Sequence, residues 1–187
     1  MTKNIFNFPT PFLSKAKKTH IKLIPVSDKS YDAWLKKQDK ATQARAKGSG
    51  FSPTGKQIMI QPGTDGPPDT IFVGVHKPLQ LYDFSKIQMA IAGAFSKEFL
   101  KDASFEIDSY CMKEADLHNA CIGWSLASYE FTAYKAATKA VPKLLWPKGV
   151  KKAHVEGRAD GIHLLRNMVN IPANHLGPDA IEKAAKK

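Results

Sequence analysis

Hydrophobic and polar residues follow two different periods along this chain, one typical of β-strands and the other typical of helices. Alternation, or a short apolar run between breakers, predicts strands at residues 20–26, 56–61, 70–75, 104–110 and 144–147. Apolar residues three or four positions apart predict helices at residues 84–95, 115–137 and 150–169, and one that is capped by Asp28 or Ser30 and ends at Lys47. This order implies a mixed or largely parallel sheet with helices on both faces, so the expected fold class is three-layer α/β/α with a long helix after it.

Two further patterns concern packing. Residues 62–68 are dense in Gly and Pro, so the strands on either side of them are expected to form a hairpin. Trp124 is expected to be buried against the sheet, on a helical stripe that it shares with Leu117, Cys121 and Phe131. The predicted long helix presents its own apolar stripe, made of Val155, Ala159, Ile162, Leu165 and Val169.

The charge balance changes the range of possible partners. The chain has 187 residues, 43% of them hydrophobic, and a formal net charge of +11. This composition suits one folded domain whose basic surface permits binding to nucleic acid or anionic membranes. Lysines form two groups, Lys15, Lys17, Lys18 and Lys22 in the first and Lys135, Lys139, Lys143, Lys148, Lys151 and Lys152 in the second. Weak DNA binding and a simply solvated lysine-rich face are both compatible with these groups.

The cysteines and the terminus bear on the compartment. Cys111 and Cys121 lie in apolar settings and are expected to be buried free thiols rather than a disulfide framework. No apolar run reaches the length of a membrane span, and the first residues lack the apolar segment of a signal peptide. We therefore expect a cytoplasmic protein without a membrane partner.

The motifs that might carry chemistry are weak. Residues 50–56 match most of a phosphate-binding loop, but a helix precedes them, Pro53 lacks an N–H, and Gln57 replaces the hydroxyl residue that would hold Mg²⁺. The six histidines, at positions 20, 76, 118, 154, 163 and 175, form no metal-binding pattern, and those of the long helix are expected to be solvated. No catalytic, cofactor-binding or metal-binding residue is predicted.

Three segments resemble the leucyl aminopeptidase (cytosol aminopeptidase) family in the same order. Residues 123–135 resemble a Gly-Trp helix of that family, residues 144–147 its next strand, and residues 161–178 the end of its linker helix with an Asn-x-Pro-Ala-Asn turn. The junction residues are Arg166, Asn170, Pro172, Ala173, Asn174 and Pro178. Proline cannot continue a helix but suits its first turn, and asparagine can bond the local backbone, so this motif predicts a bend between two helices.

The resemblance implies a division into three parts. Residues 1–148 would form a macro-domain-like, non-catalytic N-terminal domain, residues 149–175 the linker helix and turn, and residues 176–187 the beginning of the catalytic domain. The whole protein would be a hexamer that removes N-terminal residues such as leucine with two Zn²⁺ or Mn²⁺ ions, which polarise the carbonyl and activate water. Its metal ligands and catalytic residues would belong to the C-terminal catalytic domain, the partner of this one, so this chain alone is expected to be inactive.

Two points qualify the resemblance. Glu156-Gly157-Arg158 matches part of the family's active-site signature, but its neighbours differ and it lies on the linker helix, so we do not interpret it as catalytic. Some members of the family bind DNA, and a basic nucleic-acid-binding module remains one alternative function. A macro-type binder of a nucleotide-like ligand is the other, although the sequence has no Gly-rich phosphate loop of the required context.

Overall fold

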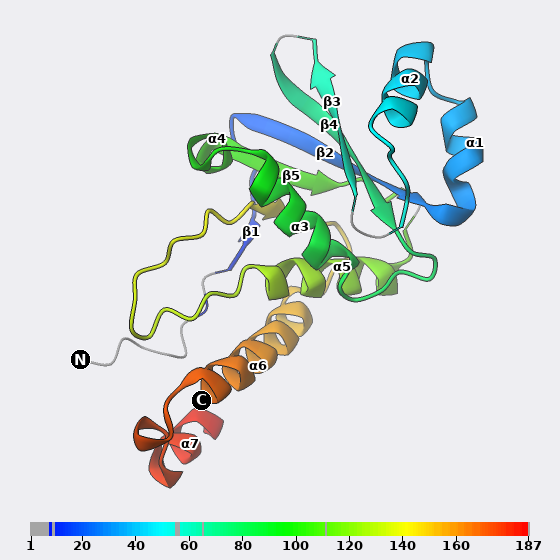
Figure 1. Cartoon of the computed structure of the whole chain (residues 1–187). Helices are drawn as coiled ribbons and strands as arrows, with labels where there is room; N and C mark the ends of the chain where they lie inside the picture. The colour runs from blue at the N-terminus through cyan, green and yellow to red at the C-terminus, as the bar shows by residue number, and fades with distance from the viewer. Residues whose placement is uncertain (1–7, 9, 55–56, 65, 111, 187) are drawn as a thin grey trace.

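A single mixed sheet forms the centre of the computed structural model, which describes residues 8, 10–54, 57–64, 66–110 and 112–186 (Figure 1). Its strands are β1 (Phe12–Leu13), β2 (Thr19–Ser27), β3 (Ile58–Gly63), β4 (Gly66–Val75), β5 (Ala103–Ile107) and β6 (Leu144–Leu145). They lie in the order β1-β6-β5-β2-β4-β3, and every neighbouring pair is parallel except the β3–β4 hairpin. The expected hairpin is therefore confirmed.

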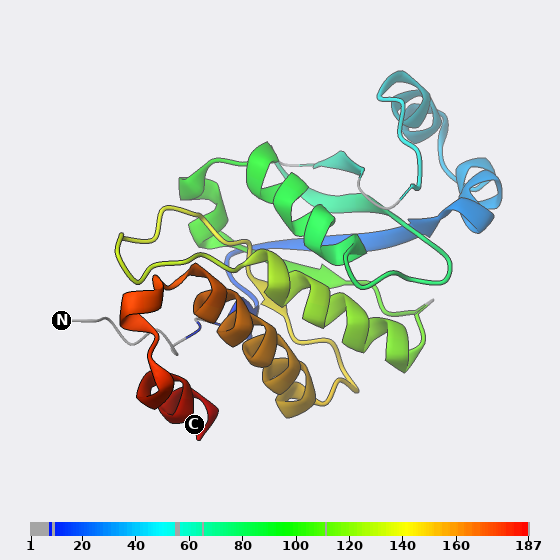
Figure 2. The same ribbon diagram turned by 60° about the horizontal axis from the view of Figure 1, so that its bottom comes forward.

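Helices lie on both faces of this sheet. They are α1 (Tyr31–Lys36), α2 (Lys40–Gly48), α3 (Asp83–Ala94), α4 (Lys97–Asp102), α5 (Glu114–Ala127), α6 (Lys152–Asn170) and α7 (Pro178–Ala185), with 3₁₀ turns at Asp28–Ser30 and Ala173–His175. Helices α3, α5 and α6 lie side by side on one face, and α1 and α2 stand at the other side (Figure 2). The predicted three-layer α/β class is confirmed.

The larger core lies between the sheet and α3, α5 and α6. Trp124 is 0% exposed there, and its indole Nε1 donates to the Pro142 carbonyl at 3.1 Å. Leu117 and Cys121 are buried with it, as the stripe predicted. A Cβ on Gly123 would lie 2.2 Å from the Leu81 carbonyl oxygen, so α5 needs glycine here to approach the segment before α3.

A smaller apolar cluster lies on the opposite face. Phe51 and Phe72 are buried in it, while Trp34 is only half-buried and packs edge-on against both rings. The single helix predicted up to Lys47 is here two helices, α1 and α2. The chain breaks because the Asp39 carboxylate accepts from the Thr42 N–H at 2.7 Å and starts a new helix.

The prediction of a helix over residues 115–137 was wrong at its C-terminal end. Helix α5 stops at Ala127, and residues 129–143 form a loop, so Phe131 does not share the stripe of Trp124. The Glu130 carboxylate closes this loop, because it accepts from the backbone N–H groups of Thr138 and Lys139 at 2.9 and 3.1 Å. The loop thus satisfies polar groups that a longer helix would have paired internally.

Smaller differences concern the other boundaries. The strand predicted at residues 104–110 ends at Ile107, and the hairpin ladder extends into the predicted 62–68 loop with a register shift between Gln61 and Gly63. Strand β1 and helix α4 were not predicted. Residue 56, where one predicted strand began, and Cys111 lie outside the described residues.

Candidate functional site

The predicted junction forms a helix, a bend and a second helix. Helix α6 ends at Asn170, Pro172 precedes the 3₁₀ turn of Ala173–His175, and Pro178 opens α7. Asn174 is exposed at the bend. Figure 1 shows α6 leading away from the sheet and α7 standing beyond it.

Tyr129 joins the two segments that carried the family resemblance. Its hydroxyl donates to the Asn167 side-chain oxygen at 2.8 Å and accepts from the Asn170 amide at 3.0 Å. The Arg166 guanidinium donates to the Leu126 carbonyl at 2.9 Å and lies 5.3 Å from the centre of the Tyr129 ring. Asn170 therefore holds the end of α6 against the loop after α5 rather than bonding its local backbone.

A second tyrosine reaches the bend from the same loop. The Tyr134 hydroxyl lies 2.9 Å from His175 Nδ1, and the two rings are in contact. Because Tyr129 and Tyr134 both come from the loop, the first part of which was predicted as helix, the wrong helix boundary hid these two contacts.

The apolar stripe predicted on the long helix is only half correct. Val155 and Ala159 are buried, but Leu165 and Val169 are 62% and 85% exposed. The buried row continues instead through His163 and Asn167, because the C-terminal half of α6 packs against the loop after α5 and not against the sheet. Leu165 and Val169 are thus left as apolar side chains on an exposed helix face.

His163 was expected to be solvated, and this prediction was wrong. The imidazole is 3% exposed and contacts the rings of Phe8 and Tyr129 at 5.3 and 5.5 Å between centroids. Neither ring nitrogen makes a hydrogen bond of normal geometry in the described part of the chain, and the nearby Ser125 backbone offsets the effect of burial on the pKa only in part. Burial, followed by the Arg166 guanidinium, lowers the pKa of His163 to about 4.

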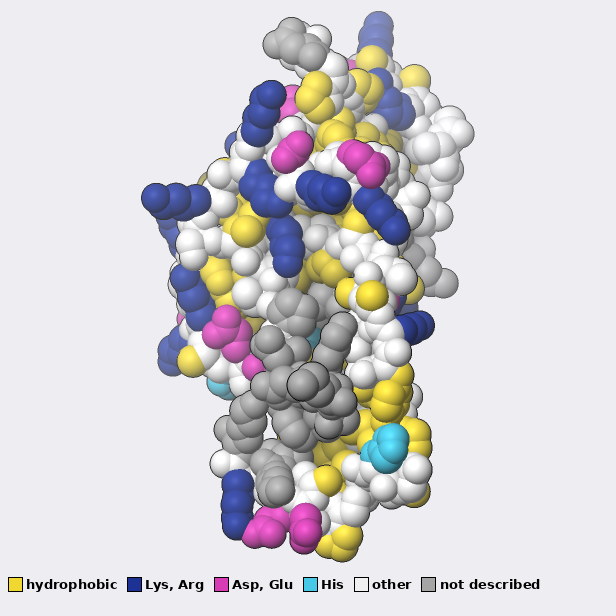
Figure 3. All heavy atoms as spheres, turned by 90° about the vertical axis from the view of Figure 1, so that its left-hand side faces the viewer, with side chains coloured by type: hydrophobic (Ala, Val, Ile, Leu, Met, Phe, Trp, Pro, Cys, Tyr) yellow, Lys and Arg dark blue, Asp and Glu magenta, His cyan; other side chains and the backbone are white. Residues whose placement is uncertain are grey.

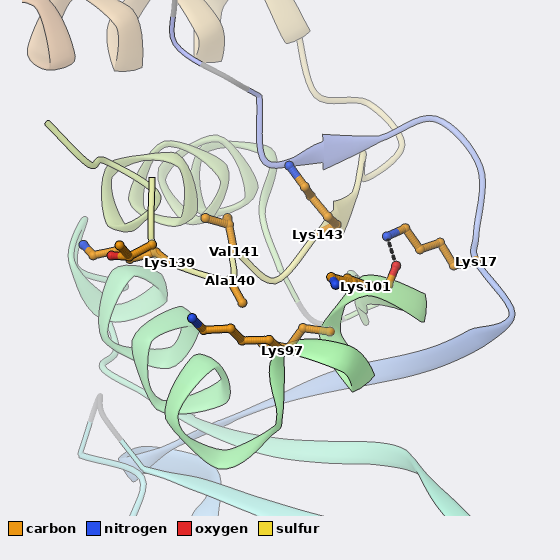
Figure 4. Close-up of a pocket in the computed structure, with 9 residues that line it drawn as sticks. Lys17, Lys97, Lys101, Lys139, Ala140, Val141 and Lys143 are labelled. Carbon is orange, nitrogen blue, oxygen red and sulfur yellow. Dashed lines mark hydrogen bonds between the residues drawn. The ribbon is translucent and has the colours of Figure 1, made fainter. Parts of the chain in front are cut away.

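Members of both lysine groups meet at a hollow that we call the lysine pocket. Its volume is about 340 Å³, and its basic lining residues are Lys17, Lys97, Lys101, Lys139 and Lys143. Figure 3 shows lysine and arginine side chains gathered on this side of the molecule. Figure 4 shows Lys97 from α4, and Ala140 and Val141 from the loop, pointing into the space between these segments.

The sheet explains why these lysines come together. Lys17, Lys101 and Lys143 come one or two positions before β2, β5 and β6, which are neighbouring parallel strands and begin at the same edge. Lys97 lies one turn before Lys101 on α4, and Lys139 comes from the loop. The sequence signal was present in Ser96, which caps α4 by accepting from the Phe99 N–H, but α4 was not predicted.

The second lysine group does not lie in one place, because only Lys139 and Lys143 of it line the lysine pocket. Lys152 lies over the Trp146 ring, 5.6 Å from its centroid, and Lys151 lines a different hollow of about 310 Å³ with His118, His154 and other residues. The two histidine rings meet edge to face at 5.7 Å. His118 is not free to bind a metal, because Nδ1 donates to the Glu114 carbonyl and Nε2 accepts from the Lys151 N–H.

A serine, a histidine and a carboxylate also meet on strands β2 and β5. His20 Nε2 donates to Glu106 at 2.7 Å, and the Ser104 hydroxyl lies 3.5 Å from His20 Nδ1. Ser104 is 0% exposed and its oxygen already accepts from the Lys17 N–H at 3.0 Å. A nucleophile must reach its substrate, so this group stabilises the strand pairing and is not a hydrolytic triad.

Other sequence motifs also lack the geometry of a site. Glu156, Gly157 and Arg158 are exposed on α6, well inside the helix. Burial raises the pKa of the Cys121 thiol to about 12, so it is an inert core thiol, as predicted. Gly55 and Lys56, the end of the loop-like motif, lie outside the described residues.

Comparison with known families identifies the family to which a chain with these features belongs. The model of the family described as "M17 aminopeptidase, N-terminal domain" matches residues 21–147. The chain belongs to this family. The predicted resemblance to leucyl aminopeptidases is therefore confirmed, and the chain has the fold and the sequence of the family's N-terminal domain.

Three solved structures share the fold of this chain. Cytosol aminopeptidase from Coxiella burnetii matches with a TM-score of 0.75 and 25% identity, over 94% of this chain and 36% of that one. The bottromycin maturation enzyme BotP in complex with Mn matches with 0.59 and 18%, over 86% and 34%. A mutant of tomato leucine aminopeptidase matches with 0.52 and 16%, over 95% and 43%. No curated protein gives a significant match.

The chain spans only 34% to 43% of the length of those structures. In the residues that the structure describes, no three His, Cys, Asp or Glu side chains form a group that could hold a metal ion. The described residues therefore do not fit a resident metal centre. Within the same residues no helix is long and apolar enough to span a bilayer.

Proposed function

We propose that this chain serves as the non-catalytic N-terminal domain of a two-metal leucyl aminopeptidase that removes N-terminal residues from peptides. Its family membership and its coverage of about a third of the related structures support this function. The two metals, Zn²⁺ or Mn²⁺, would bind in the C-terminal catalytic domain, and the structure of BotP in complex with Mn is compatible with that. The domain would contribute to assembly or regulation.

The observation that carries the proposal is the apolar face of α6. Leu165 and Val169 are 62% and 85% exposed, just before the bend to α7. Burying a Leu or Val side chain fully contributes about 1.5–3 kcal/mol, so an exposed pair is a natural contact for another domain. We assign residues 1–148 to the N-terminal domain, residues 149–175 to the linker and residues 176–187 to the start of the catalytic domain. The catalytic domain would pack on this face of α6.

The junction motif has a positioning role in this proposal. Arg166 and Asn170 hold α6 against the loop after α5, and Pro172, Ala173, Asn174 and Pro178 set the bend. A fixed bend gives the catalytic domain one orientation. Following the family resemblance, we also propose that the complete protein is a cytoplasmic hexamer; the name of the Coxiella burnetii relative, a cytosol aminopeptidase, is compatible with the compartment.

The first test is enzymatic. The purified 187-residue chain should not hydrolyse a chromogenic leucine amide with Mn²⁺ or Zn²⁺, whereas the chain extended by a catalytic domain should. Metal-dependent turnover by the chain alone, abolished by a chelator, would contradict the proposal.

The second test concerns the contact between the domains. Leu165→Glu should lower activity and thermal stability in the two-domain protein but leave the isolated chain as stable as before. Met89→Glu is the matched control, because Met89 is 65% exposed on α3. Equal effects of the two substitutions in the two-domain protein would show that the α6 face is not the contact.

A second candidate function is weak DNA binding. The net charge of +11 and the lysine-rich face in Figure 3 favour it. Binding should be spread over the basic surface and should weaken steeply between about 50 and 200 mM salt. Tight binding that salt leaves unchanged would point instead to a specific nucleic-acid module. For the macro-type nucleotide binder, the described residues provide no Gly-rich phosphate loop.

A further inference from the structure

We propose that the lysine pocket binds a small ligand that carries two or more phosphate groups. The site lies at the amino edge of β6, β5 and β2, away from α6 and α7, and the inference is independent of the aminopeptidase function. Three features of the pocket support it: its unbalanced charge, its mixed lining and its size.

The pocket concentrates positive charge without ion pairs. None of its five lysines forms a salt bridge with a carboxylate in the described part of the chain. Glu130 lies near Lys139 and offsets part of that one charge, while its oxygens accept from the backbone N–H groups of Thr138 and Lys139. Glu98 and Asp102 follow Lys97 and Lys101 by one position on α4 and do not line the pocket. Most of the positive charge is therefore left for a ligand to balance.

The lysines of the pocket repel one another. Burial, and then the neighbouring Lys17 ammonium, lower the pKa of Lys143. Backbone carbonyls hold three of the ammonium groups: Lys17 donates to Lys101, Lys143 to Thr10 and Lys139 to Tyr129. A carbonyl carries only a partial charge, so an anion that displaces these contacts would gain charge-assisted hydrogen bonds.

The number of lysines sets the class of anion. A terminal phosphate carries about −1.5 to −2 charges at pH 7, so a single phosphate leaves most of the five positive charges unmatched. A diphosphate or triphosphate matches them more closely. The volume of about 340 Å³ suits a small molecule, and Leu100, Ala140 and Val141 offer an apolar wall for an organic part. A DNA duplex would instead contact the wider lysine-rich face.

Calorimetric titration of the 187-residue chain tests the proposal, with inorganic tripolyphosphate, ATP and a short DNA duplex as probes. At about 150 mM salt, charges more than about 8 Å apart are largely screened, so only clustered lysines should retain affinity. We expect tripolyphosphate to bind and to compete with ATP. Tighter binding of ATP would identify an organic phosphate as the ligand, and equal binding would identify the phosphate chain alone.

The double variant Lys97→Gln, Lys101→Gln removes two pocket charges from side chains that make no hydrogen bond of their own in the described structure. It should weaken tripolyphosphate binding about tenfold or more. The matched control is Lys37→Gln, Lys47→Gln, which removes the same charge from exposed positions around α1 and α2 and should change binding less than about twofold. Lys97→Glu alone provides a second test if the double variant folds poorly.

Two results would overturn the proposal. The first is no tripolyphosphate binding, and the second is an equal loss in the pocket and control variants. DNA binding that both double variants weaken equally is expected, because the whole basic surface contributes to it.

Discussion

Lowering the pH should weaken the folding of this domain through one buried imidazole. The pKa of His163 is lowered from 6.5 to about 4, because the ring is buried and lies beside Arg166; the Ser125 backbone opposes this shift only in part. The unfolded chain therefore takes up a proton below about pH 6.5, whereas the folded domain takes it up only below about pH 4. Stability present above pH 6.5 is lost across this window as the pH falls.

The magnitude follows from the shift. One pKa unit corresponds to about 1.4 kcal/mol, so the full window is worth about 3 kcal/mol, of which about 2.5 kcal/mol falls between about pH 7.5 and pH 4.5. Domains of this kind have a total unfolding free energy of about 5–15 kcal/mol, so the loss is readily measured. Urea titrations followed by tryptophan fluorescence at both pH values give the two free energies.

Other groups also titrate in this range, so the comparison needs variants. His163→Leu should remove most of the pH dependence. It should also leave stability at neutral pH unchanged or higher, because a buried ring nitrogen without a partner costs about 1–3 kcal/mol. His154→Leu, on the exposed face of α6, is the control and should keep the wild-type pH dependence. If His163→Leu loses as much stability as the wild type on acidification, the reasoning is wrong.

Two further pairs of variants test the packing. Trp124→Ala should lower the free energy of unfolding in urea by about 3–5 kcal/mol, and Trp34→Ala should lower it less because that ring is half-buried. Equal losses would show that the main core has been assigned to the wrong helix. Gly123→Ala should cost at least about 1–3 kcal/mol, since its Cβ would collide with the Leu81 carbonyl. A Cβ at Gly161 would meet open space on α6, so Gly161→Ala should raise the free energy of unfolding by about 0.5–1 kcal/mol and with it the melting temperature. A lower melting temperature would refute the packing given for α6.

Local sequence patterns were sufficient to predict the elements that pack against the sheet. Trp124, Leu117 and Cys121 have helical spacing and all face the core, so periodicity alone placed them. The bend at Pro172 and the start of α7 at Pro178 were equally predictable, because proline acts through its own ring and missing N–H. These features depend on residues within one or two turns of each other.

The lysine pocket depends on contacts between distant residues, and the sequence did not predict it. Helical spacing continues past Ala127 to Tyr134, yet the Tyr129 hydroxyl bonds Asn167, 38 residues away, and Glu130 captures the backbone of Thr138 and Lys139. These tertiary contacts outweigh the weak intrinsic preference for helix. Only once residues 129–143 form a loop do the lysines before β2, β5 and β6 surround one hollow.

The stripe on α6 failed for a more informative reason. Periodicity identifies which residues are apolar and on which side of a helix they lie, but it does not identify what covers them. Val155 and Ala159 are buried by this domain, whereas Leu165 and Val169 are exposed on the C-terminal half of α6, which packs against the loop after α5. An apolar stripe that extends beyond the part of the helix covered by its own domain favours contact with a second domain. The stripe residues that this domain leaves exposed, Leu165 and Val169, are therefore the ones on which the proposed contact with a catalytic domain rests.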